Sequence, residues 1–185
     1  ISKGLEGKEL SAMGGMAKAG VVAFSDDGHY VESSDFMRKA MEYANMFHKI
    51  IIDHCEDESL VAGGQMNEGV VSAELGLKGR PAAAEDIAVA RDIILSELTD
   101  TPIHIAHIST KGAVEMVRQA KAKGLKVSAE ATPQHLILTD EALRSYEPRF
   151  KVNPPLRSED HRAAVLAGVI DGTIDAIATD HAPHT

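Results

Sequence analysis

Short apolar runs that end in an acidic or imidazole side chain recur along this chain, and helical patterns separate them. The residues that follow these runs are Asp27, His54, His107 and Asp180. A single Asp or His at a strand end is most often a helix cap or a satisfied polar group. Four in succession favour a metal centre, because parallel strands that share one rim can bring distant residues onto the same ions.

The alternation of patterns predicts the fold class. Strands are expected at 20–25, 49–54, 102–107, 125–131 and 174–179, with helices at 33–49, 82–98, 111–124 and 158–172 and a weaker helical stretch at 139–146. The absence of hairpin signals predicts a parallel sheet with right-handed crossovers. The rival is an open doubly wound sheet. It is disfavoured because polar residues end every strand and no glycine-rich phosphate loop follows any of them.

Five strands cannot close an eight-stranded barrel. We therefore expect residues 1–185 to be a portion of a single (β/α)8 barrel domain, with about five parallel strands present and three missing. The first residue is Ile1, and the last segment, HAPHT, follows a presumed strand directly. Both ends fit an excerpt from a longer chain. The long polar connection from Cys55 to Arg80 is expected to be functional, as long loops often are.

Composition limits the classes of partner. A hydrophobic fraction of 44% over 185 residues is enough for a core. The net charge of -9 disfavours nucleic acid or an anionic membrane as main partner and leaves small molecules open. No apolar stretch approaches the roughly 20 residues that span a bilayer. The lone cysteine, Cys55, excludes an intrachain disulfide and is interpreted as a buried bystander. A cytoplasmic location is expected.

The donor types indicate the chemistry. Imidazole and carboxylate without a cysteine cluster suit divalent ions such as zinc, and a carboxylate can bridge two of them. A site with two such ions activates water and polarises a carbonyl, which is hydrolytic chemistry. One or two divalent ions are therefore expected.

Several motifs together resemble those of a bacterial class I dihydroorotase, a member of the cyclic amidohydrolase superfamily. They cover essentially the whole chain and are HCEDESL, NEGVVSAELGLKGRPAAAEDIAVARD, HIAHIST, AEATPQHL, KVNPPLR and ATDHAPHT. The resemblance implies a metal-dependent (β/α)8 barrel in pyrimidine biosynthesis. It also implies an enzyme that interconverts L-dihydroorotate and N-carbamoyl-L-aspartate.

The resemblance also implies roles for individual residues. His54 in HCED and His107 in HIAHIST correspond to metal ligands. Asp180 in ATDHAPH corresponds to a metal ligand that also acts as general base. Asn153 in KVNPPLR and His184 in ATDHAPH correspond to substrate-binding residues. The alternative interpretation of Asn153 is a turn residue before proline.

Two choices depend on strand geometry. His104 and His107 are three residues apart, so in a strand they face opposite ways, and only His107 should reach the rim. Asp26 and Asp27 also face opposite ways, and by motif position Asp27 is expected to bridge the metals while Asp26 caps a turn. Hydantoinases, dihydropyrimidinases and allantoinases place a carboxylated lysine at the position of Asp27. An aspartate there resembles one dihydroorotase subgroup.

The HxHxR motif of the family's first strand is absent from this sequence. The chain by itself is therefore expected to be inactive. Two alternatives stay open beside dihydroorotase. One is another cyclic amidohydrolase of the allantoinase or dihydropyrimidinase type. The other is a non-catalytic homologue that partners aspartate transcarbamoylase; a homodimer is a further expected assembly.

Overall fold

A parallel five-stranded sheet forms the centre of the molecule. The computed structural model describes residues 1–182. The strands follow one another across the sheet in the order of the sequence, β1 Ala23–Ser25, β2 Ile50–Asp53, β5 Ile103–Ile105, β6 Val127–Ala131 and β7 Ala176–Ile177. A doubly wound sheet would reverse direction at a switch point. The sequential order is that of a (β/α) barrel wall, and within the described residues the wall is open, with β1 and β7 at its edges.

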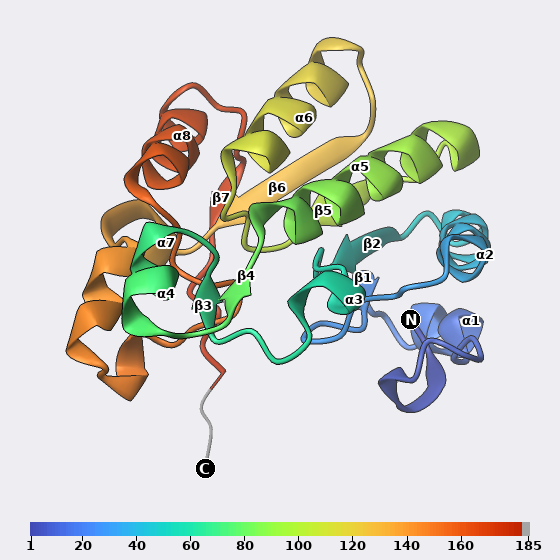
Figure 1. Cartoon of the computed structure of the whole chain (residues 1–185). Helices are drawn as coiled ribbons and strands as arrows, with labels where there is room; N and C mark the ends of the chain where they lie inside the picture. Colours follow the sequence, from blue (N-terminus) through green and yellow to red (C-terminus); the bar gives the residue numbers. More distant parts are fainter. Residues whose placement is uncertain (183–185) are drawn as a thin grey trace.

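Helices make the crossovers and cover one face of the sheet (Figure 1). They are α2 Ser34–Asn45, α5 Ala82–Thr99, α6 Lys111–Ala122 and α8 Glu159–Ile170. Ser33 and Thr110 cap α2 and α6 by accepting a hydrogen bond from a backbone N–H of the first turn. These two helices therefore begin directly after the loops that leave the carboxyl ends of β1 and β5.

The two faces of the sheet differ in chemistry. Ile103 and Ile105 of β5 are fully buried under the helices, where the main core lies. His104, between them, faces the other way and is paired in register with Ser128 of β6. Because side chains alternate along a strand, this polar face is the one that lines the inside of the barrel wall.

A small second unit, which we call the insertion, occupies residues 58–80. It contains α3 Glu58–Val61, β3 Met66–Asn67, α4 Val70–Leu75 and β4 Gly79–Arg80, and β3 pairs with β4 in parallel. Its core includes Met66 and Val71 and is shared with Leu143 and Leu156. The sequence predicted only a polar connection here. The elements are too short to leave a periodic pattern.

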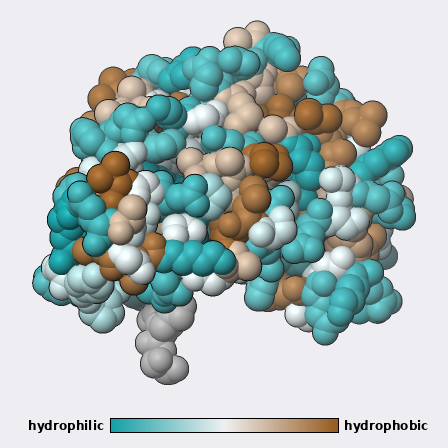
Figure 2. Space-filling model, in the orientation of Figure 1, coloured by the Kyte–Doolittle hydropathy of each residue, from teal (hydrophilic) through white to brown (hydrophobic). Residues whose placement is uncertain are grey.

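The remaining elements are short. They are η1 Lys3–Leu5, α1 Met13–Lys18, α7 Pro133–Ile137, η2 Asp140–Ser145 and η3 Pro148–Phe150. The weak helical stretch expected at 139–146 is the 3-10 helix η2. Within residues 1–182, no helix combines the length and apolar character needed to cross a membrane. Figure 2 shows hydrophobic residues in small patches among hydrophilic ones on the face in view.

Candidate metal centre

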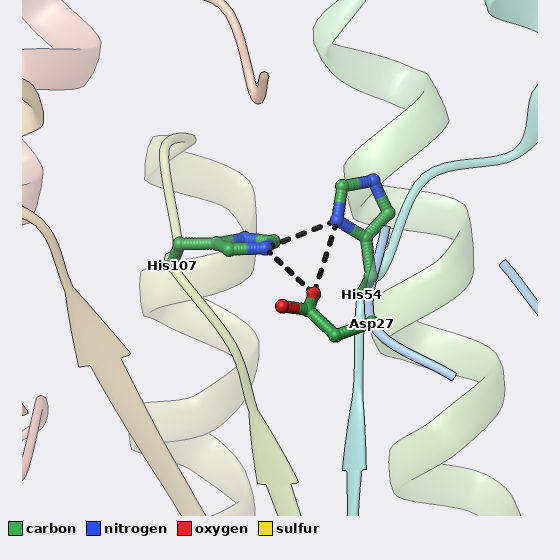
Figure 3. A group of neighbouring side chains, drawn as sticks. All are labelled: Asp27, His54 and His107. Carbon is green, nitrogen blue, oxygen red and sulfur yellow. Dashed lines mark hydrogen bonds and ion pairs between the residues drawn. The ribbon is translucent and has the colours of Figure 1, made fainter. Parts of the chain in front are cut away.

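Three side chains from three different strand ends point at one another at the rim of the sheet (Figure 3). His54 Nδ1 lies 3.0 Å from His107 Nε2. Asp27 Oδ1 lies 3.4 Å from His107 Nε2 and 3.7 Å from His54 Nδ1. Both rings are buried, whereas the Asp27 side chain is 51% exposed. The group therefore has one solvent-facing side, through which a ligand can enter.

Parallel pairing brings these residues together. Asp27 follows β1 by two residues, His54 follows β2 directly, and His107 follows β5 by two residues. The register aligns the ends of the three strands, with Ser25 opposite Ile52 and Asp53 opposite Ile105. Residues just beyond those ends must therefore meet at the same rim.

The backbone of two rim residues is unusual. His107 has a φ of 35° and Asp180 a φ of 48°, in the left-handed region that side chains other than glycine seldom adopt. Such conformations cost roughly 1–3 kcal/mol and are concentrated at functional sites. His107 therefore reaches the group through a strained turn beyond β5 rather than through alternation within a longer strand.

His104 lies apart from this group. Its Nδ1 lies 2.8 Å from Ser128 Oγ and its Nε2 lies 3.1 Å from Glu130 Oε2. Both ring nitrogens thus have partners on the neighbouring strand β6. This arrangement agrees with the expectation that only His107 of the two histidines reaches the rim.

Asp26 and Asp27 have separate surroundings. Asp26 is 2% exposed and accepts hydrogen bonds from the Ser2 backbone N–H at 2.9 Å and from the Ser2 hydroxyl. Asp27 accepts from the Gly28 N–H and approaches both histidines of the rim. The geometry therefore brings Asp27, and not Asp26, to the rim group, and the bridging role of Asp27 stays a prediction.

A cavity of about 470 Å³ opens over the group, and Asp180 and Asn153 line it together with the three rim residues. Asp180 follows β7 and is half-buried. Asn153 precedes Pro154, and its Nδ2 lies 3.3 Å from His54 Nε2. Asp180 and Asn153 thus both lie at the cavity, and their roles stay predictions. His184 lies outside the described residues.

The charges of the rim group influence one another. Burial lowers the pKa of His107, but the Asp27 carboxylate, and then Asp180, outweigh it and raise the pKa above its ordinary value. The His107 side chain holds the pKa of Asp27 below the usual range, against the opposing effect of burial. The group therefore favours a positive charge beside a carboxylate, which is also the charge pattern of a bound cation.

Comparison with known proteins places the chain in a family. The sequence pattern of the family described as dihydro-orotase-like matches residues 1–113. The chain belongs to this family. It is 57% identical over 185 residues to a dihydroorotase of Pelotomaculum thermopropionicum (strain DSM 13744 / JCM 10971 / SI) and 56% identical over 184 residues to one of Geobacter metallireducens (strain ATCC 53774 / DSM 7210 / GS-15). Each match covers 100% of this chain and 43% of the relative.

The dihydroorotase-like chain thus spans less than half the length of these curated relatives. Among solved structures, a crystal structure of a D-hydantoinase is similar with a TM-score of 0.78 and 20% identity. The likeness covers 100% of this chain and 42% of that one. At this identity it supports the fold alone, which is a partial (β/α)8 barrel.

Membership of the dihydroorotase-like family implies a metal ion, and the residues present fit one. Two ligand atoms of a tetrahedral zinc ion lie about 3.3 Å apart, because each is roughly 2.0–2.1 Å from the metal. The three distances of 3.0, 3.4 and 3.7 Å scatter around that value. The donor set of two imidazoles and a carboxylate is also one that zinc prefers.

A second group of potential ligands lies behind β2. Asp53, Cys55 and Asp92 are all buried, and their ligand atoms lie within 4.8 Å of one another. Arg91 already fills this space, with Nη2 at 3.3 Å from Asp53 and 2.6 Å from Asp92. Burial raises the pKa of the Cys55 thiol well above its ordinary value. Cys55 therefore stays a protonated bystander on the opposite side from His54.

Two residues near the rim were missed by the sequence reasoning. Glu56 Oε2 lies 3.5 Å from His54 Nε2, and Arg80 Nη1 lies 2.6 Å from Asn153 Oδ1. The acidic residue two places after His54 was a usable signal for Glu56. Nothing in the sequence indicated that Arg80, at the far end of the insertion, returns to the rim.

Proposed function

We propose that the complete protein is a metal-dependent cyclic amide hydrolase that interconverts L-dihydroorotate and N-carbamoyl-L-aspartate. The observation that carries the proposal is the convergence of Asp27, His54 and His107 at the carboxyl rim of a parallel sheet. Catalytic groups of barrel enzymes lie at this rim. The names of the curated relatives support the choice of substrate. In this proposal residues 1–185 form part of one barrel domain.

The proposed ligands of one or two zinc ions are Asp27, His54, His107 and Asp180. A bound divalent ion of this kind supplies a nucleophile at neutral pH and polarises the amide carbonyl. His54 and His107 offer Nδ1 and Nε2 toward the same point, and their burial keeps bulk water from the inner side. The open side at Asp27 leaves room for substrate above the ligands.

Asp180 is the proposed general base. Its carboxylate is held at the cavity by a strained backbone and is half-buried. It takes the proton of the attacking water and returns it to the amide nitrogen that leaves as the ring opens. A positioned general base contributes typically 10²- to 10⁴-fold to the rate.

Asn153 and His184 are the proposed substrate-binding residues. The Asn153 amide can donate and accept, which suits the ring amide of dihydroorotate. Lys151 also lines the cavity, so a cationic group stands on the same wall as Asn153. A cation on that wall favours a substrate that carries a carboxylate.

A panel of four substrates tests the proposal in the protein expressed from its full reading frame and loaded with zinc. We expect hydrolysis of dihydroorotate and discrimination on the order of 10⁴-fold against dihydrouracil, which lacks the carboxylate that the polar groups are built to bind. Hydantoin and allantoin should also be poor substrates. Comparable rates on dihydrouracil or allantoin would move the assignment to another cyclic amidohydrolase. Absence of turnover on all four would favour a non-catalytic homologue.

The proposal extends to location and assembly. We propose a cytoplasmic enzyme that forms a homodimer or associates with aspartate transcarbamoylase. Apolar side chains exposed on α5, namely Ile94 at 63% and Leu98 at 61%, support association with another protein surface. Light scattering of the purified protein alone, and mixed with the transcarbamoylase, distinguishes the two assemblies.

A further inference from the structure

The Arg80 side chain is tightly packed against the insertion. Its Nε donates to the Gly64 carbonyl at 3.0 Å, and the side chain is 23% exposed. A Cβ at Gly64 would collide with the Arg80 stem and would lie 2.9 Å from the Gly79 carbonyl oxygen. The Arg80 carbonyl accepts from Arg157 Nη1 at 2.9 Å and from the Glu68 N–H at 3.0 Å. Both the backbone and the stem of Arg80 are therefore fixed.

The end of the Arg80 side chain joins two acceptors at the rim. Its Nη1 lies 3.2 and 3.3 Å from the two oxygens of Glu56 and 2.6 Å from Asn153 Oδ1. A guanidinium NH2 has two hydrogens, so each partner can receive one. The cation also decides which way the Asn153 amide faces, because the flipped amide would turn its NH2 toward the guanidinium.

Glu56 and Asn153 both face the outer nitrogen of His54. Glu56 Oε2 lies 3.5 Å from His54 Nε2, and Asn153 Nδ2 lies 3.3 Å from the same atom. An imidazole that ligates through Nδ1 carries its hydrogen on Nε2. That hydrogen needs a hydrogen-bond acceptor. The Glu56 carboxylate can accept it, whereas the Asn153 NH2 group is itself a donor. Ligating histidines in proteins are commonly oriented by such a carboxylate.

We propose that Arg80 is a positioning residue that holds Glu56 as the hydrogen-bond acceptor of His54 Nε2 and holds Asn153 with its amide hydrogens available to substrate. Arg80 thereby acts on the metal ligand and on substrate binding without touching the reacting atoms. The inference rests on the metal centre of the proposed function. A purely structural Arg80 would instead only tie the insertion to the sheet.

Zinc affinity distinguishes the two roles, measured by competition with a chromophoric chelator in the protein from the full reading frame. Arg80→Met and Glu56→Ala should each weaken zinc binding roughly 10- to 100-fold, the range for partners of metal-ligating histidines. The double variant should lose no more than the single ones, because both changes remove the same support. Arg149→Met is the matched control. Arg149 is 71% exposed and forms an ion pair with Glu147 at the surface.

Arg80→Lys separates the proposed effect on Glu56 from the proposed effect on Asn153. A lysine keeps the charge beside Glu56 but cannot hold two acceptors in the geometry of a guanidinium. We expect a smaller loss of zinc affinity than in Arg80→Met, together with a higher KM for dihydroorotate at nearly unchanged kcat. If Arg80→Met fails to fold, Arg80→Lys decides the question by itself.

Failure of the positioning role and failure of the proposed metal centre give different results. The Arg80 variants could keep the zinc affinity and KM of the parent protein and show only a lower melting temperature. That result would overturn the positioning role and would not contradict the metal centre. A parent protein that binds no zinc would overturn the metal centre and the positioning role with it. A further loss of zinc affinity in the double variant beyond either single one would show that Arg80 does not act through Glu56.

Discussion

At the rim of the sheet a buried polar atom lies without a partner among residues 1–182 and two residues are strained, whereas the insertion has neither feature. Within that described range His107 Nδ1 is buried without a hydrogen bond, and no buried side-chain nitrogen or oxygen of residues 58–80 is in that state. The positive φ angles of His107 and Asp180 contrast with the insertion, where only glycines have them. Unpaired groups and strain cost stability and persist where they serve chemistry. This contrast supports the proposal that the rim serves chemistry and that the insertion supports it.

The largest expected effect is a loss of catalytic rate from a change at the rim. In the complete protein, Asp180→Asn should lower kcat by about two to four orders of magnitude, because the proposed base is removed. The melting temperature should stay nearly unchanged, since Asp180 is half-buried and lies in the segment after β7. Steady-state kinetics and a thermal melt by circular dichroism measure both quantities. Retained turnover of dihydroorotate would rule out the assigned role.

Arg157→Met tests the buried contacts that connect the insertion with the rim. Arg157 is 2% exposed and donates to Ser109 Oγ at 3.0 Å and Asn67 Oδ1 at 3.3 Å. Its guanidinium also lies 3.6 Å from the buried Glu85 carboxylate, which accepts from the Ser109 N–H in the loop after His107. Removing one member of a buried ion pair costs roughly 3–5 kcal/mol of unfolding free energy.

Urea unfolding measures that loss. The matched control is Arg118→Met, because the Arg118 side chain is 39% exposed and its ion pairs lie at the surface. Its cost should stay within about 1 kcal/mol. Equal losses in Arg157→Met and Arg118→Met would show that the insertion does not depend on the buried pair.

The smallest expected loss of stability comes from Gly64 in the insertion, where an added methyl group would also meet the Arg80 side chain. Gly64→Ala places a methyl group 2.9 Å from the Gly79 carbonyl oxygen and 3.0 Å from the Val61 carbonyl oxygen. Backbone atoms give way less easily than side chains, so we expect a loss of about 1–3 kcal/mol in unfolding free energy. Gly69→Ala is the control, because its nearest neighbour would lie at 3.5 Å and its φ of 171° is extended. Identical melting curves for the two variants would contradict the tight packing at Gly64.

The sheet and the approximate place of the rim were predictable because both depend on local patterns. Apolar runs with helical stretches between them predicted five parallel strands, and the order β1-β2-β5-β6-β7 agrees with the barrel wall that was expected. The polar residue after each run marked the rim. Asp27, His54 and His107 then meet because parallel strands end together.

The insertion and the support of the rim were not predictable in this way. Strands of two residues, such as β3 and β4, form through long-range hydrogen bonds and leave no periodic signal. Arg80 reaches Asn153 across 73 positions of sequence. The expected strand 102–107 was also too long, because β5 ends at Ile105 and a strained turn carries His107.

The left-handed backbone at His107 bears on how the proposed enzyme could lose its activity in evolution and keep its fold. Glycine adopts that conformation without strain, so a His107→Gly change relaxes the turn even as it deletes a proposed ligand. Selection for a stable fold would then only weakly oppose the loss of the histidine at this position. A lineage that kept the protein only for its contacts with another enzyme could shed the histidine and keep the barrel wall.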